Sequence, residues 1–493
     1  MLIRHSALYT AAKLVPGLLG VATTAVLTRL LNPHEYGLYG LALVVMTLGT
    51  IILFQWLCLS FLRFYQSRER GSNLVSTFTS MFLIMVAISA VVFSVAMVGG
   101  FIPRDLLGPC AAGLLMVWAS SWFELIARLA VAKFEPTKYM RINFARSLLV
   151  LIGASAAAWL TGSPVWTAMG TGAGIFAGAF FGKLSIPRPA WRHFDYSLAR
   201  DVVVFGAPMA ASLTLFVLVD AGTRVLLEQL DSAQALGIYT AASILSAAII
   251  GTMAEGVSSA GYSLAVREVE QGDDMSAQRQ LLANGMLLMA VLAPAAIGIA
   301  LTGNCIATTF VGSKFVSGVA PLVPWMAASS FLNNIRANHL DHAFQLGKKS
   351  HLQIWVMGLA GLVAVGLSIY LIPRDGPIGA AVAVTIGYAV ACIHSMIAGR
   401  YAYPIPLPIA ATIRVGICCI VMVLVVINLP DNGWTGLILR ATFGSIAYAL
   451  AALAVNLLES RTLAIRIARS ALARRSARAA TASRHRGQRS HYG

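Results

Sequence analysis

Four basic side chains lie within long apolar stretches of the sequence, namely Lys13, Arg146, Arg224 and Arg336. A charged group is costly away from water, so a residue of this kind usually faces a cavity or an opposite charge. Ammonium and guanidinium groups bind anions, and a guanidinium can hold two phosphate oxygens at once. We therefore predict that these four residues bind an anionic ligand, with Lys13 and Arg224 ranked ahead of the other two.

Three acidic side chains, Glu124, Asp220 and Glu255, occupy the same kind of apolar stretch. Asp220 lies four residues before Arg224, and Glu124 lies four residues before Arg128, so each pair shares a helix face and can form an ion pair. Such a pair either lowers the cost of burying charge or acts as a gate. Glu255 lies amid Gly and Ser, and either binds Na⁺ or a proton or simply faces water. We predict ion-coupling or gating roles for the three acids.

The composition indicates that these charges lie in a membrane. Apolar residues make up 58% of the chain and charged residues 11%, whereas a soluble domain carries about 25% charged residues. The net charge of +17 does not indicate nucleic-acid binding, because nine of the 36 Lys and Arg lie in the last 33 residues and most others separate apolar runs. The six cysteines lack metal-binding spacing, and we expect no disulfide.

Fourteen stretches are apolar and long enough to cross a bilayer as helices, which takes about 20 residues each. Polar residues interrupt two of these stretches, at Glu255 and at Asn333, so twelve spans is the alternative count. We predict an all-α polytopic membrane protein. The predicted spans are 8–28, 38–61, 77–99, 107–127, 142–161, 165–186, 202–222, 236–260, 281–302, 319–340, 352–372, 377–398, 408–428 and 434–457.

Basic residues are distributed unevenly between alternate loops. If the N-terminus is cytoplasmic, the inside segments and the tail carry twenty-six Lys and Arg and the outside segments carry five. Because cytoplasmic loops are enriched in these residues, we predict that both termini are cytoplasmic and that the basic tail lies on the anionic inner surface. Arg29 lies near a span end, where we expect it to reach toward the membrane interface.

Two passages of the chain resemble each other across 200 positions. TRLLNPHEYGLYG at 28–40 and TRVLLEQLDSAQALGIYT at 223–240 both place Thr-Arg before a polar break, and Gly37 corresponds to Gly237. Two further similarities follow in the same order. We infer two homologous halves of six spans. Because six is even, both halves enter the membrane from the same side and face each other across a central cleft.

The repeat predicts how the chain is divided. Two six-helix bundles are followed by two added spans and a tail. The predicted segments are 1–186 for the first bundle, 187–200 for a cytoplasmic linker, 201–400 for the second bundle, 401–458 for two additional transmembrane helices, and 459–493 for a basic cytoplasmic tail.

The passage TRLLNPHEYGLYGLA, together with GIYTAAS after the seventh span and FQLGKKS after the tenth, resembles a known family over roughly residues 1–430. That family is the polysaccharide-export branch of the multidrug/oligosaccharidyl-lipid/polysaccharide exporter superfamily, the bacterial flippases of O-antigen and exopolysaccharide units. The resemblance implies a V-shaped helix bundle in the bacterial inner membrane. It implies a polyprenyl-diphosphate-linked oligosaccharide as cargo, bound by the cationic residues, and a polysaccharide polymerase and glycosyltransferases as partners.

Two other functions are open from sequence. A multidrug/cation antiporter of the same superfamily would need an acidic cavity, whereas intramembrane Lys and Arg here equal or outnumber the acids. A polysaccharide polymerase or ligase would resemble its class in having a long outside loop with Arg and His, and the outside loops here are short. We predict that the chain is not an enzyme and needs no cofactor, and coupling to Na⁺ or a proton stays open. Tryptophans such as Trp118, Trp122 and Trp325 are candidates for a sugar path, although an interface belt or helix packing is the commoner role of such residues.

Overall fold

The protein is helical throughout the parts that the structure describes. The computed structural model describes residues 2–67, 73–182 and 194–459, and these residues contain no strand. Eleven helices in the described residues are long and apolar enough to cross a membrane. Helices satisfy their own backbone hydrogen bonds, which a bilayer requires because it supplies no water. The chain is therefore a multi-pass, all-α membrane protein, as predicted.

The first group of helices covers the N-terminal part of the chain. A π-helical turn, η1 (Thr50–Gln55), joins α2 to α3 without a break, so the three form one span. In chain order the helices are α1 (Leu2–Leu30), α2 (Pro33–Gly49), α3 (Trp56–Ser67), α4 (Asn73–Val98), α5 (Leu107–Ala132), α6 (Pro136–Thr161) and α7 (Pro164–Gly178), extended by the 3₁₀ turn η2 (Ala179–Gly182).

The second group begins after a helix that links the two. Helix α8 (Tyr196–Val217) continues through the π-helical turn η4 (Leu218–Gly222) into α9 (Thr223–Leu230). The others are α10 (Ala233–Glu270), α11 (Asp274–Leu301), α12 (Gly303–Phe310), α13 (Ser313–Ile335), η5 (Arg336–Leu340), α14 (His342–Leu346), α15 (His351–Ala402), α16 (Ile409–Val426), α17 (Gly433–Ala454) and η6 (Leu457–Glu459).

In the described residues, each of the fourteen predicted spans falls on a helix, and residues 183–186 of the span 165–186 lie outside the described residues. The ranges 352–372 and 377–398 both lie on α15, which is 52 residues long and is broken within its length at Gly376, where φ is 54°. Such a left-handed backbone conformation suits a residue without a side chain. Glu255 and Asn333, which interrupted two of the predicted spans, lie inside the continuous helices α10 and α13. The choice between fourteen and twelve spans stays a prediction.

The two similar passages of the sequence both start helices. At the start of α2, the Asn32 side chain accepts a hydrogen bond from the Glu35 N–H, and the Glu35 carboxylate accepts one from the Asn32 N–H, each at 2.9 Å. This reciprocal arrangement satisfies two backbone donors that a helix start leaves unpaired. At the start of α10, Ser232 Oγ accepts from the Ala235 N–H at 3.1 Å. Asn32 and Ser232 therefore cap helices that begin 200 positions apart.

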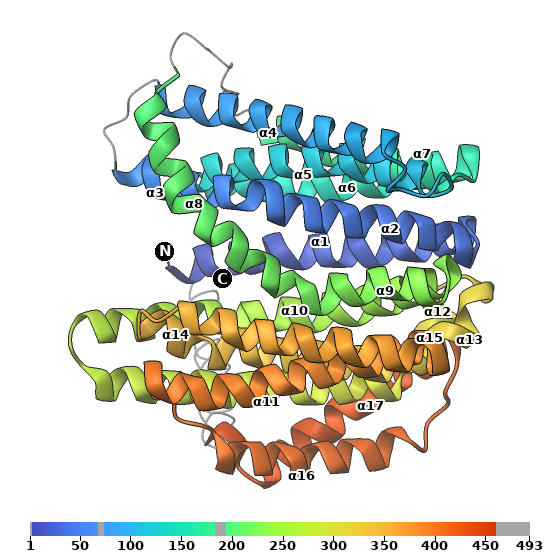
Figure 1. The fold of residues 1–493 in the computed structure, drawn as a ribbon. Helices are drawn as coiled ribbons and strands as arrows, with labels where there is room; N and C mark the ends of the chain where they lie inside the picture. The colour runs from blue at the N-terminus through green and yellow to red at the C-terminus, as the bar shows by residue number, and fades with distance from the viewer. Residues whose placement is uncertain (1, 68–72, 183–193, 460–493) are drawn as a thin grey trace, which may run out of the picture.

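Figure 1 shows the helices in two groups, with α1–α7 in the upper group and α9–α17 in the lower group. Helices α1 and α2 pack against α10 where the groups meet. Helices α16 and α17 lie at the edge of the second group, where α16 packs on α11 and α17 on α12. Helix α8 runs obliquely between the groups, and its early residues Leu198 and Val202 are buried among residues of α3, α4 and α5. The domain limits given above stay predictions.

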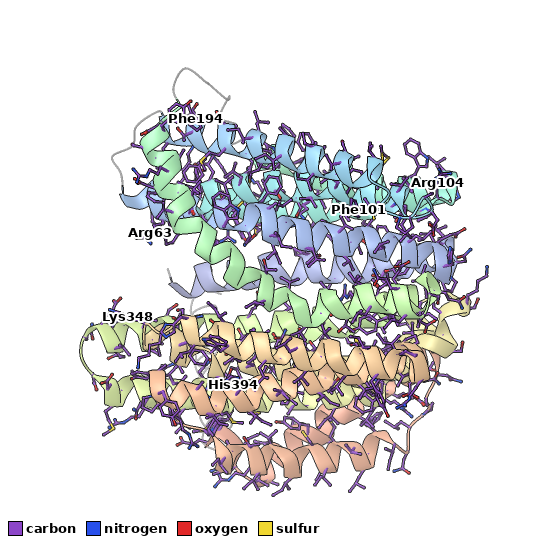
Figure 2. All side chains as sticks on the ribbon, in the orientation of Figure 1. Arg63, Phe101, Arg104, Phe194, Lys348 and His394 are labelled. Atoms are coloured by element: carbon purple, nitrogen blue, oxygen red, sulfur yellow. The ribbon has the colours of Figure 1, made fainter. Side chains whose placement is uncertain are left out.

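Labelled basic side chains mark both ends of the molecule (Figure 2). Arg63 and Lys348, both from segments predicted to face the cytoplasm, lie at the same end, and Arg104, predicted to face outward, lies at the other (Figure 2). We call the end with Arg63 and Lys348 the basic end and the end with Arg104 the opposite end. These three residues lie at the ends that the predicted topology assigns to them, and the orientation in the membrane stays a prediction.

Candidate functional site

At the opposite end, the two groups of helices touch through a pair of glycines. A Cβ atom on Gly37 of α2 would overlap the carbonyl oxygen of Ala233 on α10, and a Cβ on Gly237 would overlap the carbonyl oxygen of Pro33. The two contacts are reciprocal, since Pro33 and Gly37 correspond to Ala233 and Gly237 at the 200-residue offset. Small residues allow helix backbones to approach this closely. The repeated glycine is thus where the two repeats meet.

Arg29, at the end of α1, adds a polar contact between the two groups. Its guanidinium donates to the carbonyl oxygens of Thr309 at 2.8 Å and Phe310 at 2.9 Å, which end α12. These carbonyls lack helical partners, and the negative end of the helix dipole favours a cation there. The Gly312 N–H also donates to Thr28 Oγ1 at 3.2 Å. These contacts of Arg29 and Thr28 hold the two groups of helices together and close the opposite end.

Three adjoining cavities lie within and between the two groups of helices. The first-half pocket, about 430 Å³, is lined mainly by α1, α2, α6 and α7. The second-half pocket, about 310 Å³, is lined by η4, α9, α10, α13 and α15. The bridging pocket, about 380 Å³, shares Gly17 and Asn143 with the former and Gly251 with the latter. We call the three together the central cavity. It extends toward the basic end, because Tyr139 in the first turn of α6 lines the bridging pocket.

Arg146 lines the first-half pocket from α6. Its guanidinium carbon lies 4.7 Å from the centroid of the Phe123 ring, a distance at which a cation is attracted to the ring face. Among the side chains that the structure describes, no hydrogen bond or ion pair is recorded for Arg146. Gly178 of α7 packs directly on the Arg146 backbone. The N–H donors of Arg146 are therefore available to a ligand in the pocket.

Arg224 lines the second-half pocket but is already engaged. Its Nη2 atom lies 3.0 Å from Asp220 Oδ2 and donates to Ser243 Oγ at 3.1 Å. The predicted ion pair is thus confirmed, and it spans the junction between the π-helical turn η4 and α9. Asp220 is 43% exposed and Arg224 18% exposed on their side chains, so the pair faces the pocket rather than dry packing. The charge of Arg224 is largely offset at this position.

Glu255 lies on α10 and lines the bridging pocket opposite Pro16 and Gly17 of α1. Lys13 lies on α1 one helix turn before Gly17, and its side chain is outside the part of the chain whose side chains the structure describes. The structure therefore brings Arg146, Arg224, Asp220 and Glu255 to the walls of one cavity. They come from both halves of the chain.

Arg336 and Glu124 are not among the residues lining the central cavity. Arg336 is 6% exposed and forms an ion pair with Asp341, which is 1% exposed and also accepts from Gln353 Nε2 at 2.6 Å and Ser395 Oγ at 2.9 Å. Glu124 pairs with Arg128 at 3.6 Å, as their spacing predicted. Arg336 contacts the cavity wall through Asn333, whose Oδ1 accepts a hydrogen bond from Arg336 Nη2 at 2.8 Å.

Sequence reasoning missed the neutral polar wall of the second-half pocket. Two polar dipeptides of α13 line this pocket, and their spacing of four residues places them on one helix face. The sequence shows that spacing, which could have predicted a polar helix face, but the second dipeptide was interpreted only as an interruption of a span. The tryptophans weighed for a sugar path do not line the central cavity, and Trp118 and Trp122 instead line an apolar groove beside α4 and α7. The two dipeptides are Ser329-Ser330 and Asn333-Asn334.

The central cavity can bind a ligand but offers little for catalysis. One wall carries an available guanidinium, and the other carries hydroxyls and amides beside a balanced ion pair. In the described residues, no group of three or more His, Cys, Asp or Glu could hold a metal ion. An anion with a hydroxylated portion would complement both walls.

Solved structures with a similar fold are transport proteins. The lipid II flippase MurJ in an inward closed conformation superposes with a TM-score of 0.74 at 13% identity, covering 91% of this chain and 99% of that chain. An inward-facing MATE-family multidrug resistance transporter of the MOP superfamily gives 0.61 at 14% identity, covering 78% and 94%. An outward-facing one gives 0.51 at 14% identity, covering 80% and 95%.

The sequence comparisons identify the family. The search of curated proteins gave no match. The sequence model of the polysaccharide biosynthesis protein family matches residues 26–320, which is more than half of the chain and includes both similar passages. This match agrees with the predicted resemblance to the polysaccharide-export branch of the exporter superfamily, and the chain belongs to the polysaccharide biosynthesis protein family.

Proposed function

We propose that this chain is a flippase that moves a polyprenyl-diphosphate-linked oligosaccharide across the bacterial inner membrane by alternating access. The observation that carries the proposal is the central cavity, which is lined by helices of both groups and exposes the available guanidinium of Arg146. A cation in a site shielded from water suits a diphosphate. Membership of a polysaccharide biosynthesis family and the fold shared with a lipid II flippase support this class of cargo.

In this proposal the individual charges have different tasks. Arg146 is the primary ligand of the diphosphate, and Lys13 is its predicted companion on α1. Arg224 joins them when its pair with Asp220, 3.0 Å long in the closed arrangement, opens. Arg336 acts inside the second half, where it holds Asn333. The cargo enters from the basic end, which we propose is cytoplasmic, and leaves when the contacts of Gly37 and Gly237 separate.

Coupling to an ion is part of the same proposal. Glu255 and Asp220 line the cavity and can gain or lose a proton or Na⁺ as the halves move. Neutralising Asp220 would release Arg224 toward the cargo, which would link ion binding to cargo binding. Glu124 does not line the cavity, so in this proposal it acts as a gate through its ion pair with Arg128. The proposed protein partners are the polymerase and glycosyltransferases that use the same lipid-linked units for lipopolysaccharide or exopolysaccharide.

The test is the leaflet in which the cargo accumulates. Cells lacking the chain should accumulate the lipid-linked oligosaccharide, and a membrane-impermeant probe added outside spheroplasts should fail to label it. The wild-type chain should restore labelling. Arg146→Ala should reduce the rate of labelling at least about tenfold, since charge-assisted hydrogen bonds contribute roughly 1.5–3 kcal/mol. Full outside labelling in cells without the chain would end the flippase proposal.

A matched control separates cavity charge from membrane charge in general. Arg414 lies on α16, where its side chain is exposed and outside the central cavity. Arg414→Ala should leave labelling unchanged, with expression of each variant checked by quantitative blotting. If Arg146→Ala and Arg414→Ala behave alike, Arg146 does not bind the cargo.

The acidic residues of the cavity favour a second candidate function. Asp220 and Glu255 could attract a cationic drug, as a multidrug/cation antiporter requires. The two functions make opposite predictions for charge. An antiporter should lose drug resistance in Glu255→Gln and tolerate Arg146→Ala, whereas the flippase should depend on Arg146.

A further inference from the structure

The two halves of the central cavity differ in the chemistry of their walls. The first-half pocket contains Arg146, whose guanidinium has no recorded hydrogen bond or ion pair among the described side chains. The second-half pocket contains Arg224, whose charge is offset by Asp220 at 3.0 Å. While this pair is formed, an anion is therefore attracted to the first-half pocket and gains little from the second-half pocket. A ligand that fills both pockets must present different chemical groups to them.

The second-half pocket has the side chains that bind neutral hydroxylated groups. Ser329, Ser330, Asn333 and Asn334 lie along one face of α13, and Tyr388 of α15 faces them across the pocket. Hydroxyls and amides can both donate and accept, so they match the hydroxyls and amides of a sugar. The asymmetry is therefore between an ionic wall and a neutral polar wall.

A buried hydrogen-bond network fixes the orientation of the Asn333 side chain. Its Oδ1 atom accepts a hydrogen bond from Arg336 Nη2 at 2.8 Å, and Arg336 is itself held by the buried carboxylate of Asp341. Asp341 in turn accepts from Gln353 and Ser395. The amide oxygen of Asn333 is therefore already hydrogen-bonded, whereas Asn333 Nδ2 has no hydrogen-bond partner among the described residues. A pre-oriented donor of this kind suits selection between ligands.

A second observation indicates that the second-half pocket suits a polar ligand. Tyr239 lines the second-half pocket and is fully buried, yet its hydroxyl has no hydrogen-bond partner in the described part of the chain. The Nε atom of Arg224 is also buried without a hydrogen-bond partner among the described residues. Buried polar groups are nearly always paired, and one left unpaired is costly. Ligand hydroxyls in the pocket would satisfy groups of this type.

The two pockets are close enough for one ligand. Both include Ile244, and the bridging pocket joins them through Asn143 on one side and Gly251 on the other. We propose that the chain binds the two parts of its cargo in different halves: Arg146 in the first-half pocket binds the diphosphate, and the second-half pocket, through Asn333 and Tyr388, selects the first sugars. This inference rests on the proposed function and adds to it the residues that discriminate between cargoes.

The two sites should respond differently to mutation. A site that hydrogen-bonds a ligand hydroxyl discriminates against a ligand that lacks it, because the protein group is then left unpaired. Removing a neutral hydrogen bond should weaken the preferred sugar by about three- to tenfold. Removing Arg146 should weaken every diphosphate by at least about tenfold, whichever sugar it carries.

The experiment measures binding of four probes to the purified full-length chain in nanodiscs. The probes are farnesyl diphosphate and farnesyl diphosphates carrying one hexose, one N-acetylhexosamine or one 6-deoxyhexose. Arg146→Ala should weaken all four about equally. Asn333→Ala and Tyr388→Phe should change the ranking of the three sugars and leave farnesyl diphosphate within about twofold of wild type. Tyr388→Phe removes one hydroxyl only, so it keeps the test decisive if Asn333→Ala destabilises the chain.

The outcomes separate this inference from the proposed function. If both second-half variants keep the wild-type ranking, or if they weaken farnesyl diphosphate as much as Arg146→Ala does, the division between halves is wrong and the flippase proposal stands. If the wild-type chain binds the three sugar-bearing probes equally well, the division between halves is likewise wrong and the flippase proposal stands. If the wild-type chain binds none of the four probes, both proposals fail.

Discussion

Asp341 and Arg336 form the most deeply buried ion pair in the described part of the chain, with side-chain exposures of 1% and 6%. Two charges inside a membrane protein are tolerable only when each compensates the other and further hydrogen bonds complete the site. Gln353 and Ser395 supply those bonds to Asp341. Because the network ends at Asn333 on the cavity wall, the pair connects the interior of the second half to the proposed sugar site.

Removing one member of this pair should be much worse than removing both. We predict that Arg336→Met lowers the free energy of unfolding by about 3–5 kcal/mol, because Asp341 is left buried and uncompensated. The double variant Arg336→Met with Asp341→Asn should recover part of that loss. Thermal unfolding of the purified chain in detergent is the measurement. A double variant less stable than Arg336→Met alone would show that the pair is not the source of the effect.

The sequence shows which charges lie in apolar stretches, but not what each one faces. Arg146 and Arg336 look alike in the sequence, since both are arginines in apolar stretches. One faces a cavity and the other faces Asp341, five residues later, through the wide turn of η5. Arg29 contacts carbonyl groups about 280 residues away, and no local pattern indicates such a contact. Pairs four residues apart were predictable because helix geometry alone decides them.

At the scale of elements, α2 and α10 cross where glycines allow their backbones to touch. Alanine at Gly37 or Gly237 would place a Cβ against a carbonyl oxygen of the other helix. Overpacking of this kind typically costs about 1–3 kcal/mol. The cost falls only on the arrangement in which the opposite end is closed, so it should shift the population toward the open arrangement.

We predict that Gly37→Ala and Gly237→Ala increase access to the central cavity from the opposite end. The rate at which an impermeant thiol reagent labels a cysteine introduced at Thr24, which lines the first-half pocket, should rise severalfold. Gly298→Ala is the matched control, because a Cβ there meets nothing within 4 Å. Equal labelling in all three variants would mean that the crossing does not close the cavity.

The two added helices are held by a different arginine. Arg440 of α17 pairs with Asp431 at 2.7 Å and donates to the Leu429 carbonyl oxygen at 2.8 Å and to the Leu301 carbonyl oxygen at 2.5 Å, so it ties α17 to the end of α11. The sequence indicates that Arg440 lies in a predicted span, but the partners of its guanidinium depend on how α16 and α17 pack on the second group.

Arg440→Ala should therefore act on stability rather than on cargo. The carbonyl groups it leaves unpaired should lower the free energy of unfolding by about 2–4 kcal/mol. Binding of farnesyl diphosphate by the folded fraction should be unchanged, because Arg440 does not line the central cavity. Loss of binding without loss of thermal stability would contradict this assignment.

At the scale of the whole molecule, the repeat in the sequence predicted the architecture well. Hydropathy located the helices because each span must be apolar along its length, and the echo of Gly37 in Gly237 indicated two similar halves. The cavity was less predictable, since its walls come from α1, α6, α10 and α13, and only tertiary packing decides which faces of these helices meet. Neutral residues such as Ser330 and Asn333 carry no signal comparable to a buried charge.

The central claim is that the two halves must separate at the opposite end for cargo to pass. The most direct test joins Arg29→Cys on α1 to Thr309→Cys on α12 with a short reducible thiol cross-linker, since these positions are in contact in the closed arrangement. Cys110, the native cysteine that is not buried, is first replaced with alanine. Flipping of a polyprenyl-diphosphate-linked sugar is then followed in proteoliposomes. We predict that flipping stops in the cross-linked chain and resumes after reduction, whereas unchanged flipping while the halves are joined would contradict the account.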